Sequence, residues 1–347
     1  MNTKKDIDFR ISIDETIAIK GIAICFMLWV HLFNNSMYAD YSLFFRQTAL
    51  FGRIAISLFL FVSAYGLTVQ YAKVFNKPIK ETFKFQAKRY VKFYFSYWVI
   101  FLIFVPIGVL VFGRDLQTVY DSTNAIPVKS VIRDFFAIGG KTTYAPISWW
   151  FNTIIVGFYL LFPFLYFIAK KWTVFFLIIS AILWNFDLGV LPINMHWYMF
   201  HFAVGIVFAL HIDKVNRFLN RFNYWALLTS MLLLFCLLFY LQTFHYDQTP
   251  LDGIIALNMV LITVLLCRKL PSIGVLKFLG NHAMNIYLIH PFIFAYFFSE
   301  FIYSFKYPAL IFLVLLAVCL TISIVIEYGK QIARFPVLIK NIINRIG

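Results

Sequence analysis

Two ionisable residues in the first apolar stretch of the chain have types and spacing that could support chemistry. Lys20 lies near one end of the run from Ile17 to Phe33, and His31 lies near the other end. A helix turns about 100° and rises about 1.5 Å per residue, so eleven positions return to within roughly 20° of the same direction, roughly 16 Å further along. We therefore expect both side chains on one helix face. Because ionisable groups inside a bilayer are costly, the pair indicates a functional site.

The composition predicts the kind of protein that must hold this pair. Of the 347 residues, 62% are hydrophobic and 13% are charged, against about 25% charged in soluble domains. The mean hydropathy is +0.82. The net charge of +15 comes from basic residues between the apolar stretches, which indicates membrane topology rather than nucleic-acid binding. The cysteines have no paired spacing, so we expect neither disulfides nor a zinc site; they are Cys25, Cys236, Cys267 and Cys319.

The apolar stretches predict an all-α polytopic membrane protein with a bundle of about ten transmembrane helices. Each stretch is near the length that a spanning helix needs. They cover about 17–33, 50–71, 93–112, 147–169, 172–190, 195–211, 223–243, 251–267, 280–299 and 308–328. We expect one transmembrane domain over 17–328, a leader at 1–16 and a tail at 329–347.

The segments between these stretches predict the orientation of the bundle. If the N-terminus is cytoplasmic, the cytoplasmic segments hold most of the Lys and Arg, including a strongly basic loop at 72–92, whereas the acidic residues divide almost evenly. This asymmetry is the positive-inside rule, so we expect both termini in the cytoplasm. Lys20 then lies near the cytoplasmic face and His31 near the outer face. The longest loop, 113–146, is outside, and we expect it to be structured and to cover a site.

Five short motifs resemble those of the membrane-bound acyltransferase-3 family. In the first helix that family has Arg-Gly where this chain has Lys20-Gly21, at the same spacing before His31. The other four motifs are Ser57 to Tyr65, which resembles a phenylalanine-rich run ending Ser-Gly-Phe; Arg89 to Lys92, which resembles Arg-x-x-Arg; Trp150-Phe151 with the later Pro163; and Tyr287 to Pro291, which resembles Tyr-Leu-x-His-x. The chain departs from the family pattern at Lys20 and Lys92, which replace Arg, and at Ala64, which replaces Gly. The two lysines keep the charge but lose the bidentate geometry of arginine.

The resemblance covers nearly the whole chain, and it implies ten helices and an activity. Members of the family move an acyl group, usually acetyl from acetyl-CoA, onto a hydroxyl of an extracytoplasmic carbohydrate. It therefore implies an O-acetyltransferase of the cytoplasmic membrane that acts on a cell-surface polysaccharide or its lipid-linked precursor. The implied partners are that glycan acceptor, membrane lipids and the machinery of polysaccharide assembly.

Within this resemblance, His31 is the candidate catalytic residue. Imidazole titrates near working pH and can take the proton of a sugar hydroxyl. It could also carry the acyl group covalently, and the sequence does not separate these routes. Arg53, level with His31 in the expected orientation, could stabilise an oxyanion or bind acidic sugar groups. The alternatives are a histidine bonded to a neighbouring helix and an arginine anchored at the interface.

The candidate donor site lies in the basic segment. Arg89 and Lys92, with Lys88, are suited to the phosphates of CoA, which is found on the cytoplasmic side. Basic residues after a span also fix topology and meet anionic lipid, which is the alternative. Lys20 could contact the phosphate or pantetheine part of the donor, pair with Glu327, or extend its amine to the interface.

Four more intramembrane polar residues are candidates, and their alternative role is hydrogen bonding between helices. They are Ser63, Asn152, Tyr287 and His290. His196, Trp197 and His201 have the composition of an aromatic belt at the outer surface, with carbohydrate stacking as the second interpretation. The histidine spacings are not those of metal ligands on one helical turn, so we predict no metal.

Two other functions remain open from the sequence. One is a transporter or flippase for a lipid-linked sugar, which also needs polar residues inside a bundle. The other is a non-catalytic membrane partner of a polymer synthase, which the replacement of Arg by Lys at positions 20 and 92 makes more plausible. The motif set favours the acyltransferase, because a transporter does not need the Lys20–His31 spacing together with a basic segment.

Overall fold

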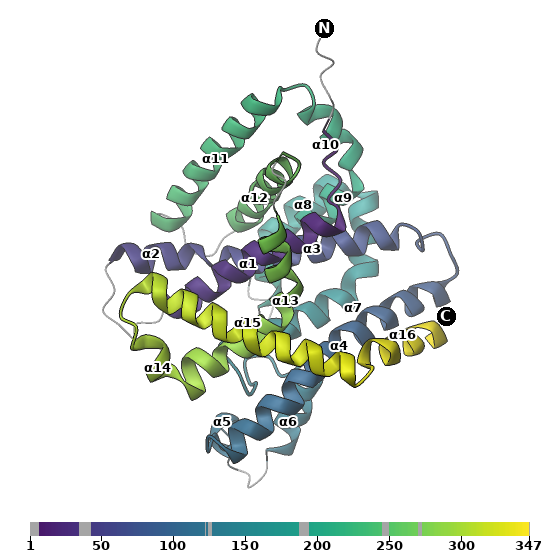
Figure 1. The fold of residues 1–347 in the computed structure, drawn as a ribbon. Coiled ribbons are helices and arrows are strands. Elements are labelled where there is room, and N and C mark those ends of the chain that lie inside the picture. The colour runs from purple at the N-terminus through teal and green to yellow at the C-terminus, as the bar shows by residue number, and fades with distance from the viewer. Residues whose placement is uncertain are drawn as a thin grey trace. The chain divides into compact units, whose positions relative to one another are not determined.

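The computed structural model describes residues 7–34, 43–121, 123, 127–186, 194–244, 250–269 and 273–346. These residues form helices and connecting turns, with no strand among them (Figure 1). The all-α prediction is confirmed. The helices are α1 (Ile13–Phe33), α2 (Leu43–Phe51), α3 (Ile54–Tyr71), α4 (Ile79–Leu110), α5 (Leu116–Val119), α6 (Val128–Phe135), α7 (Trp150–Lys171), α8 (Thr173–Ile182), η1 (Leu183–Asn185), η2 (Met195–Tyr198), α9 (Met199–Leu210), α10 (Ile212–Leu219), α11 (Tyr224–Phe244), α12 (Leu251–Cys267), α13 (Gly274–Pro291), η3 (Phe292–Phe297), α14 (Ser299–Tyr303), α15 (Pro308–Ile332) and α16 (Phe335–Ile346).

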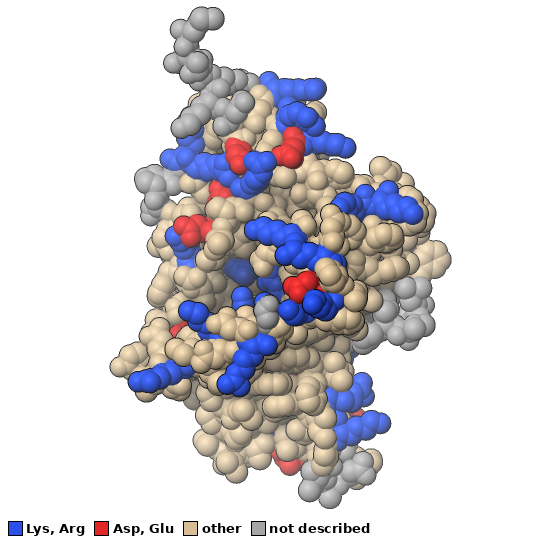
Figure 2. Space-filling model, turned by 90° about the vertical axis from the view of Figure 1, so that its right-hand side faces the viewer, with Lys and Arg blue, Asp and Glu red and all other residues tan. Residues whose placement is uncertain are grey.

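The helices are those of a multi-pass membrane protein. Within the described residues, six helices are long and apolar enough to span a bilayer, and a seventh is added if α9 and α10, bent by 78°, count as one span. Figure 2 shows one face of the molecule, on which Lys and Arg gather in patches between broad areas without charge. The finer predictions, about ten spans with both termini in the cytoplasm, stay predictions.

The basic segment differs from the prediction of a loop at 72–92. Residues 79–92 are the first turns of α4, which continues without a break into the apolar stretch. Pro78 precedes the helix with φ −53° and ψ 148°, a proline geometry that suits the residue before a helix. The segment also holds four Lys and one each of Glu, Gln, Ala and Arg, which are good helix formers. Hydropathy does not detect a charged helix, and this explains the error.

The contacts divide the chain into two compact units. The first consists of Met1–Lys73, Pro163–Leu188 and His196–Asn281, as far as these are described, and the second consists of Val74–Phe162, Gly189–Met195 and His282–Gly347. In the first unit α3 packs against α1, α9 and α12 (Figure 1). Ala64 of α3 faces Gly205 of α9, so a small residue on each helix allows the close crossing.

Two glycines set the crossing of α1 with the first turns of α13 in the first unit. A Cβ on Gly21 would collide with the carbonyl oxygen of Leu276, and a Cβ on Gly280 would collide with that of Ile17. The backbones of the two helices therefore touch directly, as small residues permit in membranes. The glycine next to Lys20 has this packing role.

Gly280→Ala is expected to destabilise the protein, because the added methyl group meets backbone that cannot move aside. Overpacking of this kind costs about 1–3 kcal/mol. Gly274→Ala, on the same helix with open space around it, is the matched control. The melting temperature of the purified protein in detergent should fall for the first variant and not for the second; equal values would contradict the crossing.

The segment before α1 is extended and is held by two asparagines of the α10 region in the first unit. Asn220 Oδ1 accepts from Ile7 N at 2.8 Å, its Nδ2 donates to Ile7 O at 2.8 Å, and Asn216 Oδ1 accepts from Phe9 N at 2.8 Å. Residues four apart on a helix are about 6 Å apart, and residues two apart on a strand are about 6.6 Å apart. The two spacings match, so successive asparagines meet alternate residues of the extended segment.

In the second unit, aromatic residues of α4 hold α6, a helix of the segment 113–146. Trp98 stacks on Phe135 with ring centroids 4.9 Å apart, and its Nε1 donates to the Phe135 carbonyl at 2.8 Å. Tyr94 donates to the Phe136 carbonyl, also at 2.8 Å. The C-terminal carbonyls of a short helix lack helical partners, and these two side chains supply them. The predicted structured loop is thus fixed to a long helix.

Candidate functional site

His31 and Lys20 lie on one unbroken helix, as predicted. A capping box starts α1, with the Ser12 side chain accepting from Glu15 N while Glu15 accepts from Ser12 N. His31 is in the last turn of the helix, and both candidate side chains are partly buried. The local sequence therefore places Lys20 and His31 at two levels of the same helix.

Arg53 lies beside the second half of α1 within the first unit. It occupies the turn between α2 and α3. Its neighbour Gly52 packs so closely on α1 that a Cβ there would lie 2.9 Å from Cβ of Val30, the residue before His31. The turn that holds Arg53 thus packs on α1 near Val30, and the expectation that Arg53 is level with His31 stays a prediction.

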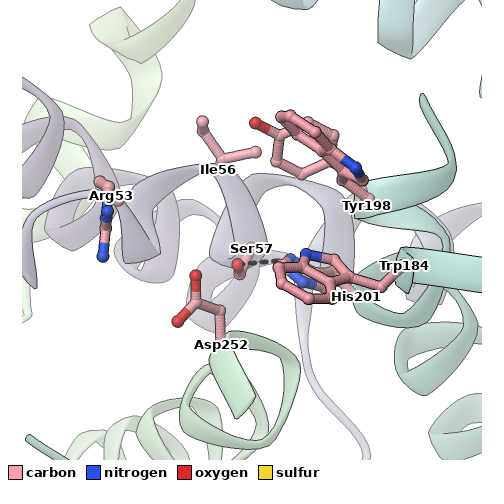
Figure 3. A pocket seen from close by; sticks show the side chains of 8 residues that line it. Arg53, Ile56, Ser57, Trp184, Tyr198, His201 and Asp252 are labelled. Carbon is pink, nitrogen blue, oxygen red and sulfur yellow. Dashed lines mark hydrogen bonds between the residues drawn. The ribbon is translucent and has the colours of Figure 1, made fainter. Parts of the chain in front are cut away.

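A pocket of the first unit opens beside Arg53 (Figure 3). Its polar groups come from helices far apart in sequence, and aromatic rings form its other walls. The polar residues are Arg53, Ser57, His201 and Asp252, and the aromatic residues are Trp184, Trp197 and Tyr198. Ser57, His201 and Asp252 are almost fully buried, so the pocket brings polar groups deep into an apolar unit.

Two hydrogen bonds hold three of these polar side chains in place. Ser57 Oγ and His201 Nδ1 are 2.7 Å apart and joined by a hydrogen bond, the dashed line in Figure 3. Gln242 Nε2 donates to Asp252 Oδ1 at 3.1 Å. Buried polar groups need such partners. Ser57 begins the phenylalanine-rich motif, so one motif residue has a clear positioning role in this pocket.

The candidate donor residues lie on the first half of α4 in the second unit. Arg89 is partly buried and lies over the Phe85 ring, with its guanidinium carbon 5.4 Å from the centroid. Its Nη2 is buried and has no hydrogen-bond partner among the described residues. Lys88 is partly buried, whereas Lys92 is exposed. Among Lys88, Arg89 and Lys92, Arg89 is thus the residue with a buried N–H group to which a ligand's acceptor atom can bind.

Gln86 reaches from the same face of α4 to α7. Its Nε2 donates to the carbonyl oxygen of Tyr159. That carbonyl has no helical donor, because the residue four positions on is Pro163, which lacks an N–H. The bond fixes the orientation of the amide, and Gln86 Oε1 remains buried without a partner among the described residues. Pro163 of the Trp-Phe…Pro motif therefore has a local structural consequence.

Asn152, Tyr287 and His290 lie in the second unit. Tyr287 donates from its hydroxyl to the carbonyl of Ser148, in the turn before α7, at 2.7 Å, so it joins α13 to that turn and not to a second helix. Asn152 is 1% exposed, and its Nδ2 is buried without a hydrogen-bond partner among the described residues. Ser63, the fourth candidate, is in the other unit and is partly exposed on α3.

His290 supplies a hydrogen-bond donor that a second proline, Pro291, removes from the helix. Pro291 cannot donate to the Tyr287 carbonyl, and His290 Nδ1 lies 2.8 Å from that oxygen. A carbonyl only accepts, so Nδ1 carries the proton and Nε2 has the lone pair. The π-helix η3 follows at once, so the predicted span 280–299 is instead α13, η3 and the start of α14. His290 is fully buried.

A buried carboxylate in the segment 113–146 was not among the residues predicted from the sequence. Asp134 Oδ1 accepts from Tyr97 at 2.8 Å, and its Oδ2 accepts from Tyr120 at 2.8 Å and from Tyr144 N at 2.6 Å. Burial raises the pKa of Asp134 to about 6, and the three hydrogen bonds counteract only part of this rise. Asp134 therefore organises the loop over 113–146.

Stability is expected to fall as the pH rises from about 4 to about 6. The folded protein holds the Asp134 proton more tightly than the unfolded chain, whose pKa is near 3.8. This contribution is complete below pH 4 and is lost as the pH passes through the folded pKa. The loss is on the order of 3 kcal/mol, at about 1.4 kcal/mol per pKa unit. The melting temperature of Asp134→Asn should depend less on pH across this range than that of the wild type. Asp121→Asn, at an exposed site, should keep the wild-type dependence. An equal dependence of the melting temperature on pH in both variants would exclude Asp134 as the cause.

Sequence reasoning missed Ser57, Asp252, Gln86 and Asp134 as members of sites. One signal could have indicated Asp252, since an acidic residue that begins an apolar stretch is unusual. The role of Gln86 could have been inferred from Pro163 only with the pairing of α4 and α7 known.

The comparisons with known proteins agree with the motifs. A family model described as an acyltransferase domain matches residues 11–328. No curated protein matches the chain, and no solved structure matches it.

Proposed function

Because the chain belongs to the acyltransferase 3 family, we propose that it transfers acetyl from acetyl-CoA to a hydroxyl of a cell-surface polysaccharide or of its lipid-linked precursor. The cytoplasmic membrane is its proposed location, with the donor bound from the cytoplasm and the acceptor outside. The observation that carries the proposal is the match itself, which includes residues of both compact units and all five motifs.

The proposed chemistry centres on His31. As the acceptor oxygen attacks the thioester carbonyl, its proton passes to the imidazole. In this proposal Arg53 stabilises the oxyanion that forms. The carbon–sulfur bond then breaks, and the imidazolium returns the proton to the sulfur of CoA. The covalent route, in which His31 first carries the acetyl group, gives the same overall balance.

We assign the binding of acetyl-CoA to the basic first half of α4. A CoA phosphate offers the acceptor atom that Arg89 Nη2 lacks among the described residues, and Arg–phosphate bonds are strong and directional. Lys88 and Lys92 add positive charge along the same segment. Glu327, considered as a partner of Lys20, is ion-paired with Lys330 at 2.7 Å.

The test compares the surface glycan of cells with and without this protein. NMR of the glycan should show O-acetyl signals that disappear on deletion and return with the intact gene. Purified protein in proteoliposomes should move label from [14C]acetyl-CoA to that glycan. Unchanged acetyl content, with altered export or polymer length, would instead favour a transporter or a non-catalytic partner.

A further inference from the structure

A groove in the first unit lies between the extended segment before α1 and the α10 region. Its volume is about 510 Å³, which is within the range of small-molecule sites. The polar residues that line it are Asp8, Arg10, Asn216, Arg217, Asn220 and Arg221. Three arginines stand against one aspartate, so the lining has an excess of positive charge. At the height that α10 has in Figure 1, Figure 2 shows Lys and Arg gathered with acidic side chains among them.

Most of these polar groups are used in building the groove. Arg10 Nη1 donates to Asp8 Oδ2 at 3.1 Å, and Asn216 Nδ2 donates to Asp8 Oδ1 at 2.8 Å. The other amino group of Arg10, Nη2, is paired with Asp213 Oδ1 at 2.5 Å. Asn216 and Asn220 also bond the backbone of the extended segment. The walls of the groove are therefore fixed before any ligand binds.

Arg217 is the arginine of the groove that remains for a ligand. It is exposed, and its guanidinium makes no hydrogen bond or ion pair with the part of the chain that the structure describes. Lys214, one turn earlier, is exposed on the same helix face, and Arg221 lines the groove one turn later. A guanidinium binds phosphate through two parallel hydrogen bonds. The chemistry of the groove thus suits a phosphate group.

The side of α10 next to these cations is apolar and exposed. Phe218 is 56% exposed and Phe222 is 47% exposed, and their ring centroids are 5.6 Å apart. Cations beside exposed aromatic rings are typical of a helix that lies in a membrane interface. The axis of α10 is bent by 78° from that of the apolar α9. If α9 enters the bilayer, α10 then runs along its surface.

We propose that this groove binds the phosphate of an anionic phospholipid. Arg217 holds the phosphate, Lys214 and Arg221 add positive charge beside it, and the two phenylalanines lie among the acyl chains. These rings favour a lipid over a free phosphate, which has no apolar part to cover them. The orientation predicted from the loop charges places α10 at the cytoplasmic surface, where anionic lipid attracts basic segments. The binding does not depend on the proposed acetyl transfer.

The experiment measures lipid binding to the full chain in neutral detergent. Phosphatidylglycerol is titrated in, and bound lipid is counted by native mass spectrometry. We expect Arg217→Ala to raise Kd for this lipid at least about tenfold, since it removes hydrogen bonds to a charged group, and Lys214→Ala to raise it less. Arg133→Ala, at an exposed arginine of α6, a helix as long as α10, is the matched control. Melting temperatures without lipid verify folding.

Two further ligands identify the source of the phosphate. Phosphatidylcholine with the same chains has no net charge and should bind at least about tenfold more weakly; equal binding would overturn the preference for anionic lipid. Glycerol 3-phosphate should not displace phosphatidylglycerol, whereas Phe218→Ala should weaken it. Displacement by glycerol 3-phosphate at the Kd of the lipid would assign the groove to a soluble phosphate and overturn the proposal. A Kd for Arg217→Ala equal to that of Arg133→Ala would overturn the site itself.

Discussion

His31→Ala is expected to lower the rate of acetyl transfer by about 100- to 10,000-fold, the usual contribution of a positioned acid–base residue. The expectation rests on the place of His31 in the last turn of α1, next to Val30, on which the Arg53 turn packs. The rate is measured as label transferred from acetyl-CoA to glycan in proteoliposomes. Either catalytic route gives this loss, since both use the imidazole.

Cys25→Ala is the control for this loss, because Cys25 lies on the same helix and is also partly buried. It should express, fold and transfer acetyl like the wild type. His31→Gln keeps much of the side-chain volume without the titration and should be as inactive as His31→Ala. Full transfer by a well-folded His31 variant would remove His31 from the mechanism.

Arg89→Ala is expected to raise KM for acetyl-CoA by about 10- to 100-fold. Hydrogen bonds to charged groups contribute about 1.5–3 kcal/mol, and about 1.4 kcal/mol corresponds to a factor of ten. The buried Nη2 of Arg89 gives this residue the largest share among the basic residues of α4. KM is measured with glycan held at saturation.

Three further variants define the donor site. Arg89→Lys keeps the charge but loses the planar fork, so it should recover only part of the affinity. Lys92→Ala should have a smaller effect than Arg89→Ala, because Lys92 is exposed. Lys80→Ala removes an exposed charge at the start of α4 and should leave KM unchanged; a KM for Arg89→Ala equal to that of Lys80→Ala would show that Arg89 does not bind the donor.

Apolar length alone predicts much of the fold. The stretch 251–267 coincides with α12, and 223–243 differs from α11 by one residue at each end. The length of the apolar stretches does not predict the helix bounds where the helix forms for a reason other than hydropathy. Residues 79–92 are helical because of propensity and the preceding Pro78, and the chain after Pro291 forms a π-helix because the proline removes a donor.

The site was predictable only where its residues follow one another in sequence. Lys20 and His31 share a helix, so spacing gives their geometry. The pocket gathers Ser57, His201 and Asp252, and only the packing of α3, α9 and α12 brings these together. Asp134 resembles any loop aspartate in sequence, and its burial depends on tyrosines from three separate segments.

The bonds from Asn216 and Asn220 to the extended N-terminal segment have a consequence for the path of the chain. Segments in contact lie on the same side of a bilayer whose hydrocarbon layer is about 30 Å thick, so the chain between them must cross an even number of times. The helices between them that are long and apolar enough to cross on their own are α1, α2 with α3, α4 and α7, and α9 is added if it counts with α10 as one bent span. With α9 counted, the number is odd, so parity requires one more crossing. The only shorter apolar helix in the described part of this interval is Thr173–Asn185, which is α8 with η1. We therefore expect α8, though short for a spanning helix, to cross the membrane as well.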